Sequence, residues 1–399
     1  MDLLSGQPYW LAKNGLTDFS HLSNKNRDTE VLVIGGGITG ALMLYNLTKA
    51  GFSTVLVDKR RFGTGSTSAS TALLQYQIDV PLSELQEMIG VDKANRAYKH
   101  CALAIVELLR ISKEIDFKNI YARPTLFKAS DIRGQQLIEK EFELHQSLGL
   151  KVELLSQKDI GNTFGFKAPG GLWSNHSAET DPFQLMDALQ QWSEKKGAVL
   201  LQLTEVESLK TTEGGIEAHL SDKSTIKAKY AVYASGYEID EKLYRDIVSL
   251  NTTFAYITEP SGSAENWHQN SLIWETAEPY HYMRSADNGS IIVGGGDIKG
   301  NDPKRRARLL NRKVVRLRKH FLKMFPHLNQ PVEFQWAGTF GSTKDGLPYI
   351  GAIDGTPNVF YALGFGGNGI TFSTLAGKLI TQQMKGEFSA EAELYKFER

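Results

Sequence analysis

The chain has 399 residues, enough for two domains, and its 41% hydrophobic and 23% charged residues are ordinary for a globular protein. Its 45 basic and 45 acidic residues cancel, so the net charge predicts neither nucleic acid nor an acidic membrane surface as a partner. The single cysteine, Cys101, excludes an intramolecular disulfide and a cysteine-based zinc site, and its apolar helical surroundings predict a small buried side chain.

The N-terminal sequence lacks the basic start and long apolar stretch of a signal peptide, and no run of about 18 apolar residues occurs. We therefore expect a cytoplasmic protein without a membrane span. Residues 1–28 are predicted to form an ordered N-terminal arm, in which Tyr9, Trp10 and Phe19 are available to dock on the body.

The first predicted unit along the chain is a strand, a helix and a second strand. Residues 31–34 are a short apolar run of β type, residues 40–49 have helical spacing, and residues 54–57 form a second buried strand. Gly51 marks the end of the helix. This β-α-β order is typical of a parallel sheet that binds a nucleotide.

Further elements follow without a repeat or a low-complexity linker. Their alternation predicts an α/β fold with an α+β substrate layer, in which a mostly antiparallel sheet is interleaved with a Rossmann-like domain. We expect helices at residues 94–116, 131–148, 181–195, 303–325 and 368–384, and strands at residues 199–209, 215–220, 225–233, 252–260 and 289–297.

Gly35, Gly37 and Gly40 form the pattern G-x-G-x-x-G between the first predicted strand and the helix. The first glycine allows a tight turn, the second lets a phosphate approach the backbone, and the third lets the helix pack closely on the strand. A pyrophosphate would then lie at the helix N-terminus, and Asp58, at the end of the second strand, would accept hydrogen bonds from ribose hydroxyls. The alternative is a glycine turn and a surface aspartate.

Residues 61–76, RFGTGSTSASTALLQY, gather small hydroxyl side chains before an apolar stretch. They predict a loop and a helix N-terminus that hydrogen-bond a ligand phosphate. The alternative, which is compatible with the first, is a capped helix start with Ser68 or Ser70 at the N-cap.

Two later segments place small residues at predicted turns. An apolar strand ends in Ala234, Ser235 and Gly236, which are small enough for a cofactor to pass close by. Within residues 345–380 a group of glycines precedes a helix, whose N-terminal amide groups would stabilise negative charge on a reduced ring. A glycine-rich turn without a ligand is the alternative. The glycines are Gly364, Gly366, Gly367 and Gly369.

In their order and spacing, the segments VLVIGGGITG, VYASGY, GLPYIG and GFGGNGIT resemble the FAD-dependent D-amino acid oxidase superfamily, which includes glycine oxidase, sarcosine oxidase and gamma-glutamylputrescine oxidase. The early SGQPYW is similar to the last of these branches. The resemblance implies removal of a hydride from a C–H bond next to an amine nitrogen, hydrolysis of the imine, and electron transfer to oxygen or another acceptor. The substrate would be a small amine or amino acid.

The same resemblance implies an extended FAD and a division of the chain. Adenosine would lie near the glycine motif and Asp58, and the isoalloxazine beside Leu73 and Leu74. The FAD-binding domain would comprise residues 29–80, 150–238 and 335–390, and the substrate domain residues 81–149 and 239–334. The expected cofactor contacts are Gly35, Gly37, Ile38, Thr39, Gly40, Asp58, Lys59, Arg60, Gly65, Ser66, Thr67, Ser68, Leu73, Leu74, Val206, Ala234, Ser235, Gly236, Gly366, Gly367, Asn368, Gly369, Ile370 and Thr371.

Two departures from the family pattern bear on the substrate and on the flavin. Members that bind amino acids often carry an arginine for the substrate carboxylate just before the GLPYIG-type segment, where this chain has Phe340. This weakens an assignment to glycine or a D-amino acid and leaves open an amine, or a carboxylate held from elsewhere. Sarcosine oxidases attach flavin through a cysteine in this region, whereas Cys101 is far away in sequence, so we expect non-covalent FAD.

Residues 274–297 resemble a pair of strands that faces the flavin. Tyr280, Tyr282 and Arg284 alternate and would share one strand face, with Arg284 pairing a carboxylate or, alternatively, forming an ordinary surface ion pair. His281 would point to the opposite face. Lys299 would assist oxygen reduction, with a solvated loop lysine as the alternative. The candidate catalytic residues are therefore Tyr282, Arg284 and Lys299, and the histidines show no spacing typical of a metal site.

Two other functions stay open on the sequence alone. One is an FAD dehydrogenase that passes electrons to a quinone or a protein, and the other is a flavin-binding redox sensor without turnover. The basic run at residues 304–320 suggests nucleic acid at first, but it has an apolar face formed by Leu309, Leu310, Val314, Val315 and Leu317. We expect an amphipathic helix that packs on the protein.

Overall fold

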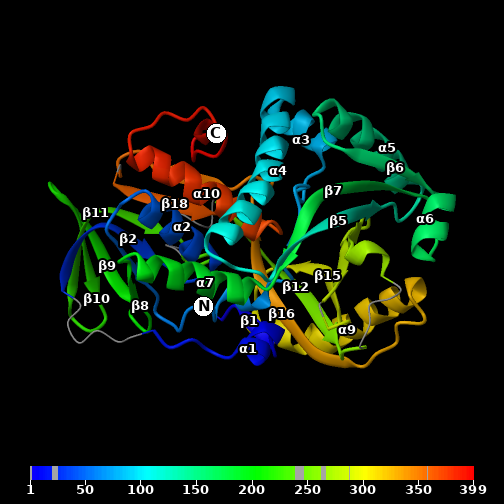
Figure 1. The fold of residues 1–399 in the computed structure, drawn as a ribbon, viewed down its shortest axis with the longest axis horizontal. Coiled ribbons are helices and arrows are strands. Elements are labelled where there is room, and N and C mark those ends of the chain that lie inside the picture. The colour runs from blue at the N-terminus through cyan, green and yellow to red at the C-terminus, as the bar shows by residue number, and fades with distance from the viewer. Residues whose placement is uncertain (1, 20–25, 239–246, 262–266, 287, 357) are drawn as a thin grey trace.

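The computed structural model describes residues 2–19, 26–238, 247–261, 267–286, 288–356 and 358–399. Two large sheets lie side by side, one in the left half of Figure 1 and one in the right half, with helices packed against both. Each sheet is assembled from several separate pieces of the chain. The predicted α/β class with an interleaved, mostly antiparallel layer is confirmed.

The first sheet has the strand order β17-β18-β11-β2-β3-β8 in the described part of the chain, and β9 and β10 continue from β11. Its central strands are parallel and apolar because both faces are covered. Helices α2, α7 and α10 belong to the core on one face, and β9 and β10 close the other. The elements are β2 (Arg27–Ile34), α2 (Ile38–Lys49), β3 (Thr54–Val57), α7 (Pro182–Lys195), β8 (Val199–Leu201), β9 (Val206–Thr212), β10 (Gly215–Leu220), β11 (Thr225–Tyr233), β17 (Tyr349–Ala352), β18 (Val359–Leu363) and α10 (Gly369–Met384).

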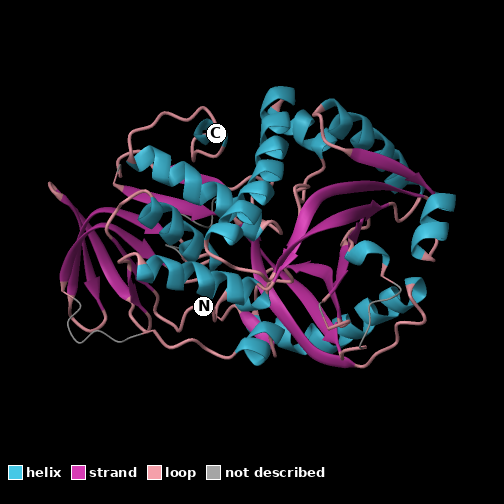
Figure 2. Ribbon diagram, in the orientation of Figure 1, coloured by secondary structure: helices cyan, strands magenta, loops and turns pink. Residues whose placement is uncertain are grey.

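The second sheet has the order β1-β16-β12-β15-β14-β13-β5-β7-β4, with β6 beside β7. Neighbouring strands in this sheet are antiparallel except β13 and β5, which are parallel. Figure 2 shows the long strands of the sheet crossing the right half of the molecule. The elements are β1 (Leu4–Gly6), β4 (Leu73–Leu74), α3 (Leu82–Ile89), α4 (Val91–Glu114), β5 (Ile120–Lys128), α5 (Ile132–Ser147), β6 (Val152–Ser156), α6 (Gln157–Phe164), β7 (Gly170–Thr180), β12 (Ser249–Thr258), β13 (Leu272–Glu275), β14 (His281–Ser285), β15 (Ile291–Lys299), α9 (Pro303–Met324) and β16 (Val332–Ser342).

Helices α4 and α9 illustrate how apolar periodicity positions the cores. Cys101 in α4 is fully buried, as its surroundings predict. In α9, the buried Leu310, Val314 and Leu317 lie in the core under the second sheet, while the basic residues between them stay largely exposed. The prediction of an amphipathic helix packed on the protein is confirmed.

The N-terminal arm is tied to the second sheet. β1 pairs with β16, and the short helix α1 (Tyr9–Asn14) follows it. Arg306 of α9 is fully buried and donates to the carbonyl of Leu4 at 2.9 Å, which fixes the arm to the body. The arm residues expected to dock are buried: Tyr9, Trp10 and Phe19.

The strand pairing differs from the predicted segmentation at three places. β6 and β7 pair with the second sheet, although residues 150–238 were expected in the FAD-binding domain, and β16 also lies there. Apolar runs do not reveal which sheet a strand joins, since the pairing depends on partners distant in sequence. The predicted strand at residues 199–209 is two strands, β8 and β9, because the chain turns at Leu203 with a φ of 54°. We therefore propose to assign residues 150–180 and 332–342 to the substrate domain.

Candidate functional site

A cavity of about 350 Å³ is lined by residues of both sheets. The first sheet contributes the ends of its parallel strands and the β2–α2 loop, and two loops that cross between the sheets complete the wall. Since ligands of open α/β sheets bind outside the carboxyl ends of the strands, the location fits a nucleotide site. The cavity is lined by residues 3, 57–60, 204–206, 233–238, 253, 338–340 and 364–371, and by parts of residues 34–39, 63–79 and 274–297.

The glycines of the β2–α2 loop are required by close backbone contacts. Gly35 has a φ of 114°, and a Cβ atom there would lie 2.5 Å from the carbonyl oxygen of Ala234. A Cβ atom on Gly40 would lie 1.8 Å from the carbonyl oxygen of Gly35. The turn therefore brings the helix onto the strand in the way the sequence predicts, and its first turn opens on the cavity.

Asp58 is held at the cavity by two backbone amides. Its Oδ2 accepts from Gly36 N at 2.7 Å and its Oδ1 accepts from Arg60 N at 2.8 Å. Burial raises the pKa of Asp58, although these two hydrogen bonds oppose the shift. Each carboxylate oxygen keeps a second lone pair for a ligand hydroxyl.

The two cations next to Asp58 are neutralised by Glu238. Arg60 Nη1 lies 2.7 Å from Glu238 Oε2 and Lys59 Nζ lies 3.3 Å from Glu238 Oε1. Burial alone would raise the pKa of Glu238, but the Arg60 and Lys59 charges outweigh it and hold the pKa at about 2. The charges at this end of the cavity are therefore largely paired with one another.

The serine- and threonine-rich segment braces the glycine loop. Thr67 Oγ1 accepts from Ile38 N at 2.9 Å, and Ser68 Oγ donates to Gly65 O at 2.8 Å. The expected helix capped by Ser68 or Ser70 is wrong. Ser66–Ala69 is one short 3₁₀ turn, after which the chain extends into β4, because pairing with β7 outweighs the local capping signal.

The start of α10 forms the opposite wall. Asn368 Nδ2 donates to the carbonyls of Gln75 at 3.0 Å and Gln77 at 2.9 Å, which locks the glycine turn to the loop after β4. The N-cap side chain of α10 accepts no hydrogen bond from the helix, and its first residues line the cavity. Their amide groups are directed to a ligand with acceptor atoms.

Nearly all of the predicted cofactor contacts meet at this cavity. Gly40 and Ser68 are the exceptions, because Gly40 supports the turn from behind and Ser68 is buried under it. The predicted residues that line the cavity are Gly35, Gly37, Ile38, Thr39, Asp58, Lys59, Arg60, Gly65, Ser66, Thr67, Leu73, Leu74, Val206, Ala234, Ser235, Gly236, Gly366, Gly367, Asn368, Gly369, Ile370 and Thr371.

The far end of the cavity is aromatic and acidic. Tyr280 and Tyr282 line it as expected, with ring centroids 5.8 Å apart, and Trp274 stands edge-on to Tyr280 at 6.3 Å. Phe340 also lines it, in β16 of the second sheet. Burial raises the pKa of Tyr282 to about 12, so its phenol stays protonated at neutral pH.

Two carboxylates at this end, Asp79 and Asp297, are absent from the sequence-based candidates. Asp79 follows β4 and accepts from Gly367 N at 2.8 Å, and Asp297 is on β15. Burial raises the pKa of Asp79, and it raises the pKa of Asp297 to about 6 with a further contribution from the Asp79 charge. No short motif marks either residue, and the only available signal is that Asp297 ends the predicted strand at residues 289–297.

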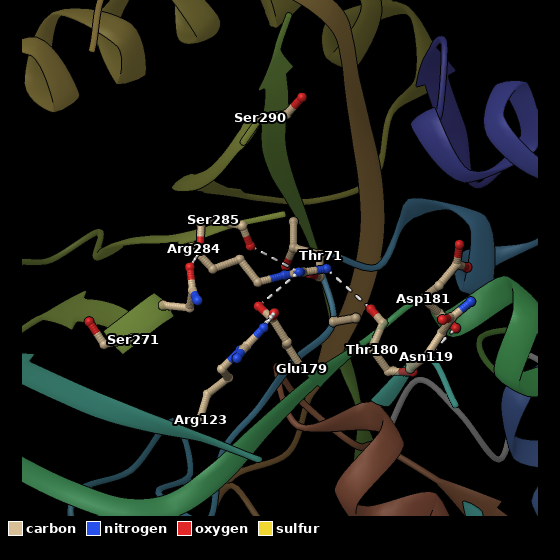
Figure 3. A network of polar contacts seen from close by, with 12 residues as sticks. Thr71, Asn119, Arg123, Glu179, Thr180, Asp181, Ser271, Arg284, Ser285 and Ser290 are labelled. Atoms are coloured by element: carbon tan, nitrogen blue, oxygen red, sulfur yellow. Dashed lines mark hydrogen bonds and ion pairs between the residues drawn. The ribbon is translucent and has the colours of Figure 1, made fainter. Parts of the chain in front are cut away.

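Arg284 does not reach the cavity, which corrects its predicted role. Its Nε donates to Thr71 O at 2.9 Å, its Nη1 to Glu179 Oε2 at 3.1 Å and its Nη2 to Thr180 O at 3.1 Å. Figure 3 shows this guanidinium enclosed by Thr71, Glu179 and Thr180. Alternation along the strand does not by itself place a side chain in the cavity. The buried carboxylate of Glu179 pairs with the Arg284 guanidinium and holds it away from the cavity.

Lys299 is likewise outside the cavity wall, at the exposed end of β15. The strand carries it past the rim, so the structure does not support a contact with the flavin. His281 points away from the cavity, as expected, and makes an ion pair with the buried Glu275. His320 joins the same carboxylate at 3.3 Å.

Glu275, His281 and His320 have ligand atoms within 4.8 Å of one another, a spacing that the sequence does not reveal. Lys128 also binds the Glu275 carboxylate, and Ser130 donates to it at 3.2 Å. Burial alone would raise the pKa of Glu275, but the hydrogen bonds from His281 and His320 and the charge of Lys128 hold it well below its usual range. The cluster is a hydrogen-bonded tie between β13, β14 and α9.

The cavity has polar atoms that a ligand would satisfy. Within the described residues, Gln75 Nε2, Gln77 Oε1 and Asp297 Oδ1 are buried without a hydrogen-bond partner, and all three residues line the cavity. Buried polar atoms are normally hydrogen-bonded. Together with two helix N-termini, they fit a ligand that carries phosphates and a polar ring, as FAD does.

None of the helices in the described part of the chain combines the length and the apolar character that a membrane crossing requires.

Comparison with known proteins also indicates a flavin-binding protein. A family model described as FAD dependent oxidoreductase matches residues 30–383. The chain is 25% identical over 390 residues to gamma-glutamylputrescine oxidoreductase of Escherichia coli strain K12, covering 95% of this chain and 88% of that protein. It is 23% identical over 364 residues to glycine oxidase of Bacillus licheniformis, covering 90% and 93%. Glycine oxidase from Geobacillus kaustophilus shares the fold, with a TM-score of 0.79, 18% identity and coverage of 92% and 96%.

Proposed function

The chain belongs to the FAD-dependent oxidoreductase family, and from this premise we propose that it binds FAD without a covalent bond and oxidises the C–N bond of an amine or amino acid. The observation that carries the proposal is the continuity of one cavity. A dinucleotide-type glycine loop lies at one end, and a chamber lined by aromatic and acidic side chains lies at the other, so a bound redox ring would meet a substrate there.

The residues fall into two groups along the cavity. The β2–α2 loop and Asp58 would hold the ADP half, since amides at a helix N-terminus favour phosphate and a carboxylate accepts from ribose. Leu73, Leu74 and the first turn of α10 would hold the isoalloxazine. The buried, unpartnered Gln75 Nε2 and Gln77 Oε1 are available for its polar edge.

When bound, FAD supplies the ability to accept a hydride from carbon. The chain supplies the enclosure and the orientation. Tyr280, Tyr282, Trp274 and Phe340 surround the chamber with aromatic surface, which excludes water and positions the carbon next to the amine nitrogen. The phenols stay protonated because burial raises both tyrosine pKa values, so they act as hydrogen-bond donors.

The test of this function is anaerobic mixing of the purified yellow protein with primary amines, secondary amines and amino acids, followed by the flavin absorbance. Bleaching by one class supports the proposal. If no amine and no amino acid bleaches a protein with FAD bound, the proposal fails. The rate at which air restores the colour then distinguishes oxygen from a quinone or protein acceptor. The acceptor and the cytoplasmic location stay predictions.

Non-covalent attachment is tested separately. Cys101, the one cysteine, is fully buried in α4 and is not part of the cavity wall, so no thiol is available to the flavin. Acid precipitation is expected to leave all yellow colour in the supernatant. Colour that stays with the precipitated protein would contradict this expectation.

A further inference from the structure

The two ends of the cavity differ in the cations that stand beside their acids. Among the described residues that line it, the lysine and arginine side chains are Lys59 and Arg60, and both bind Glu238 at the nucleotide end. The substrate end has Asp79 and Asp297 and no lining lysine or arginine in the described part of the chain. A substrate therefore meets an excess of negative charge.

Among the described residues, no salt bridge neutralises either acid of the pair. Asp79 accepts from Gly367 N at 2.8 Å and from the Tyr280 hydroxyl at 3.4 Å, and Asp297 Oδ1 has no hydrogen-bond partner. The ammonium group of Lys313 in α9 acts on Asp297 from outside the cavity wall, where it donates to the carbonyl of Gly296. Both carboxylates keep lone pairs for a donor inside the cavity.

The surrounding rings suit a cation as well. Trp274, Tyr280 and Tyr282 stand together at this end, and aromatic faces attract ammonium groups electrostatically. Phe340 adds apolar surface and offers no charge to a carboxylate. Acidic side chains and aromatic rings together are the chemistry that recognises an alkylammonium ion.

We propose that Asp79 and Asp297 bind the ammonium group of the substrate, and that the substrate is an aliphatic amine without a carboxylate on the carbon that bears the nitrogen. This rests on the proposed function and names its substrate class. A carboxylate on that carbon would be brought beside the same two acids with no lining lysine or arginine to pair with it. Such like-charge placement selects against amino acids.

Asp297 also has a part in the proton transfer. Hydride leaves carbon readily only when the nitrogen holds a free lone pair, so the bound ammonium must first lose a proton. The N–H bond breaks, an O–H bond forms on Asp297, and the ion pair becomes a neutral amine and a neutral carboxylic acid. Burial raises the pKa of Asp297 to about 6, which makes its carboxylate a suitable base near neutral pH.

Several groups face Asp297 and set this titration. They come from the loop after β4, from β14 and from α9. Asp79 raises its pKa, whereas the charges of Lys313 and His281 lower it, and the phenols of Tyr280 and Tyr282 stay protonated beside it. Affinity for an ammonium ion is therefore expected to rise as the pH increases through about 6, because the carboxylate of Asp297 forms over that interval.

The experiment uses the FAD-bound protein and two probes of the same shape. tert-Butylamine carries an ammonium and has no hydrogen on the carbon next to nitrogen, so it binds without reacting, and pivalate is its carboxylate counterpart. Binding is followed by the flavin absorbance and by calorimetry. We expect tert-butylamine to bind and pivalate not to bind. Binding of pivalate in preference to tert-butylamine overturns the proposal.

Variants assign the binding to the pair. Asp297→Asn and Asp79→Asn are each expected to weaken tert-butylamine binding by about tenfold or more. Asp297→Asn should also remove the pH dependence near 6, which a merely structural role would leave unchanged. Glu213→Gln, an exposed acid in the turn between β9 and β10, is the control and should bind as the parent does. Unchanged affinity in Asp297→Asn contradicts the proposal even if Asp79→Asn does not fold.

A second pair of compounds separates this proposal from the general one. Norvaline is butylamine with a carboxylate on the carbon that bears nitrogen. Bleaching by butylamine and not by racemic norvaline supports both proposals. Bleaching by norvaline alone overturns the amine assignment and leaves the oxidoreductase function intact. Bleaching by neither compound or any other amine or amino acid, with tert-butylamine bound through Asp297, retains the acidic ammonium site and removes the enzymatic function.

Discussion

The two ends of the cavity are built in different ways. The nucleotide end is formed largely by backbone groups of one β-α-β unit, and the two cations that follow Asp58 are paired with Glu238. The substrate end is formed by side chains from separate segments, and its carboxylates, Asp79 and Asp297, are not paired with a cation in the wall. The nucleotide end depends on close backbone approach, whereas the substrate end depends on which side chains the sheets bring together.

The largest effect is expected at the nucleotide end, from Gly40→Ala. A Cβ atom there would lie 1.8 Å from the carbonyl oxygen of Gly35, which is backbone and unable to move without opening the loop. We expect the variant to retain no FAD, as measured by visible absorbance per protein after purification with added FAD. Gly161→Ala in α6, with no neighbouring atom within 4 Å, is the matched control. Full FAD content in Gly40→Ala would contradict the role of the close approach.

A second large effect is expected beside the substrate end. Arg284→Met removes the donor of three buried acceptors, Glu179 Oε2, Thr71 O and Thr180 O, whereas Arg123 still pairs with Glu179. We expect it to lower the free energy of unfolding by about 3–5 kcal/mol. Denaturant unfolding measures this change. Arg284→Met combined with Glu179→Met and Arg123→Met should recover part of the loss, because all three charges of the network are then removed. An Arg284→Met variant with the parent's stability and a lost affinity for amino acids would restore the substrate role that the sequence suggests.

The glycine loop and Arg284 show which parts of the site can be predicted from the sequence and which cannot. The glycine spacing and Asp58 are local to one supersecondary unit, so their geometry follows from the backbone, and nearly every contact predicted there lines the cavity. The predicted combination of a Rossmann-like domain and a mostly antiparallel sheet also follows from the periodicity of apolar residues. The predicted role of Arg284 is wrong because its partner, Glu179, lies on β7, more than a hundred residues earlier in the chain. No local sequence pattern indicates that contact.

Asp79 and Asp297 are missed for the same reason. Asp79 reaches the substrate end because Gly367 at the start of α10 binds it, and Asp297 because β15 pairs with β12 and β14. Both depend on pairings across the sheets. A lone aspartate at the end of a strand is usually a surface residue, and only the assembled cavity makes these two a pair.

A smaller effect is expected on stability from Asp297→Asn, and its sign follows from the raised pKa. Folding raises the pKa of Asp297 from its usual 3.8 to about 6, so its favourable contribution to stability is present below about pH 4 and lost as the pH rises through 6. The variant should unfold nearly like the parent at pH 4 and be more stable by up to about 3 kcal/mol at pH 8. Thermal unfolding of the FAD-free forms at both pH values measures this difference. Lower stability of the variant than of the parent at pH 8 would show that favourable interactions in the folded protein outweigh the cost of burying the ionised Asp297 carboxylate.

The smallest effect is expected from Lys299→Ala, which tests where the substrate end stops. Lys299 and Asp297 share a face of β15, but two residues of strand separate them by about 7 Å, and only Asp297 lines the cavity. The reoxidation rate of the reduced protein in air should stay within about twofold of the parent, as for an ordinary surface change. Lys313→Met is the informative partner, because the Lys313 ammonium is held beside Asp297 on the other side of the wall and lowers its pKa. If Lys299→Ala slows reoxidation and Lys313→Met does not, the positive charge that assists oxygen reduction is that of Lys299. The substrate end would then extend beyond Asp297 to Lys299.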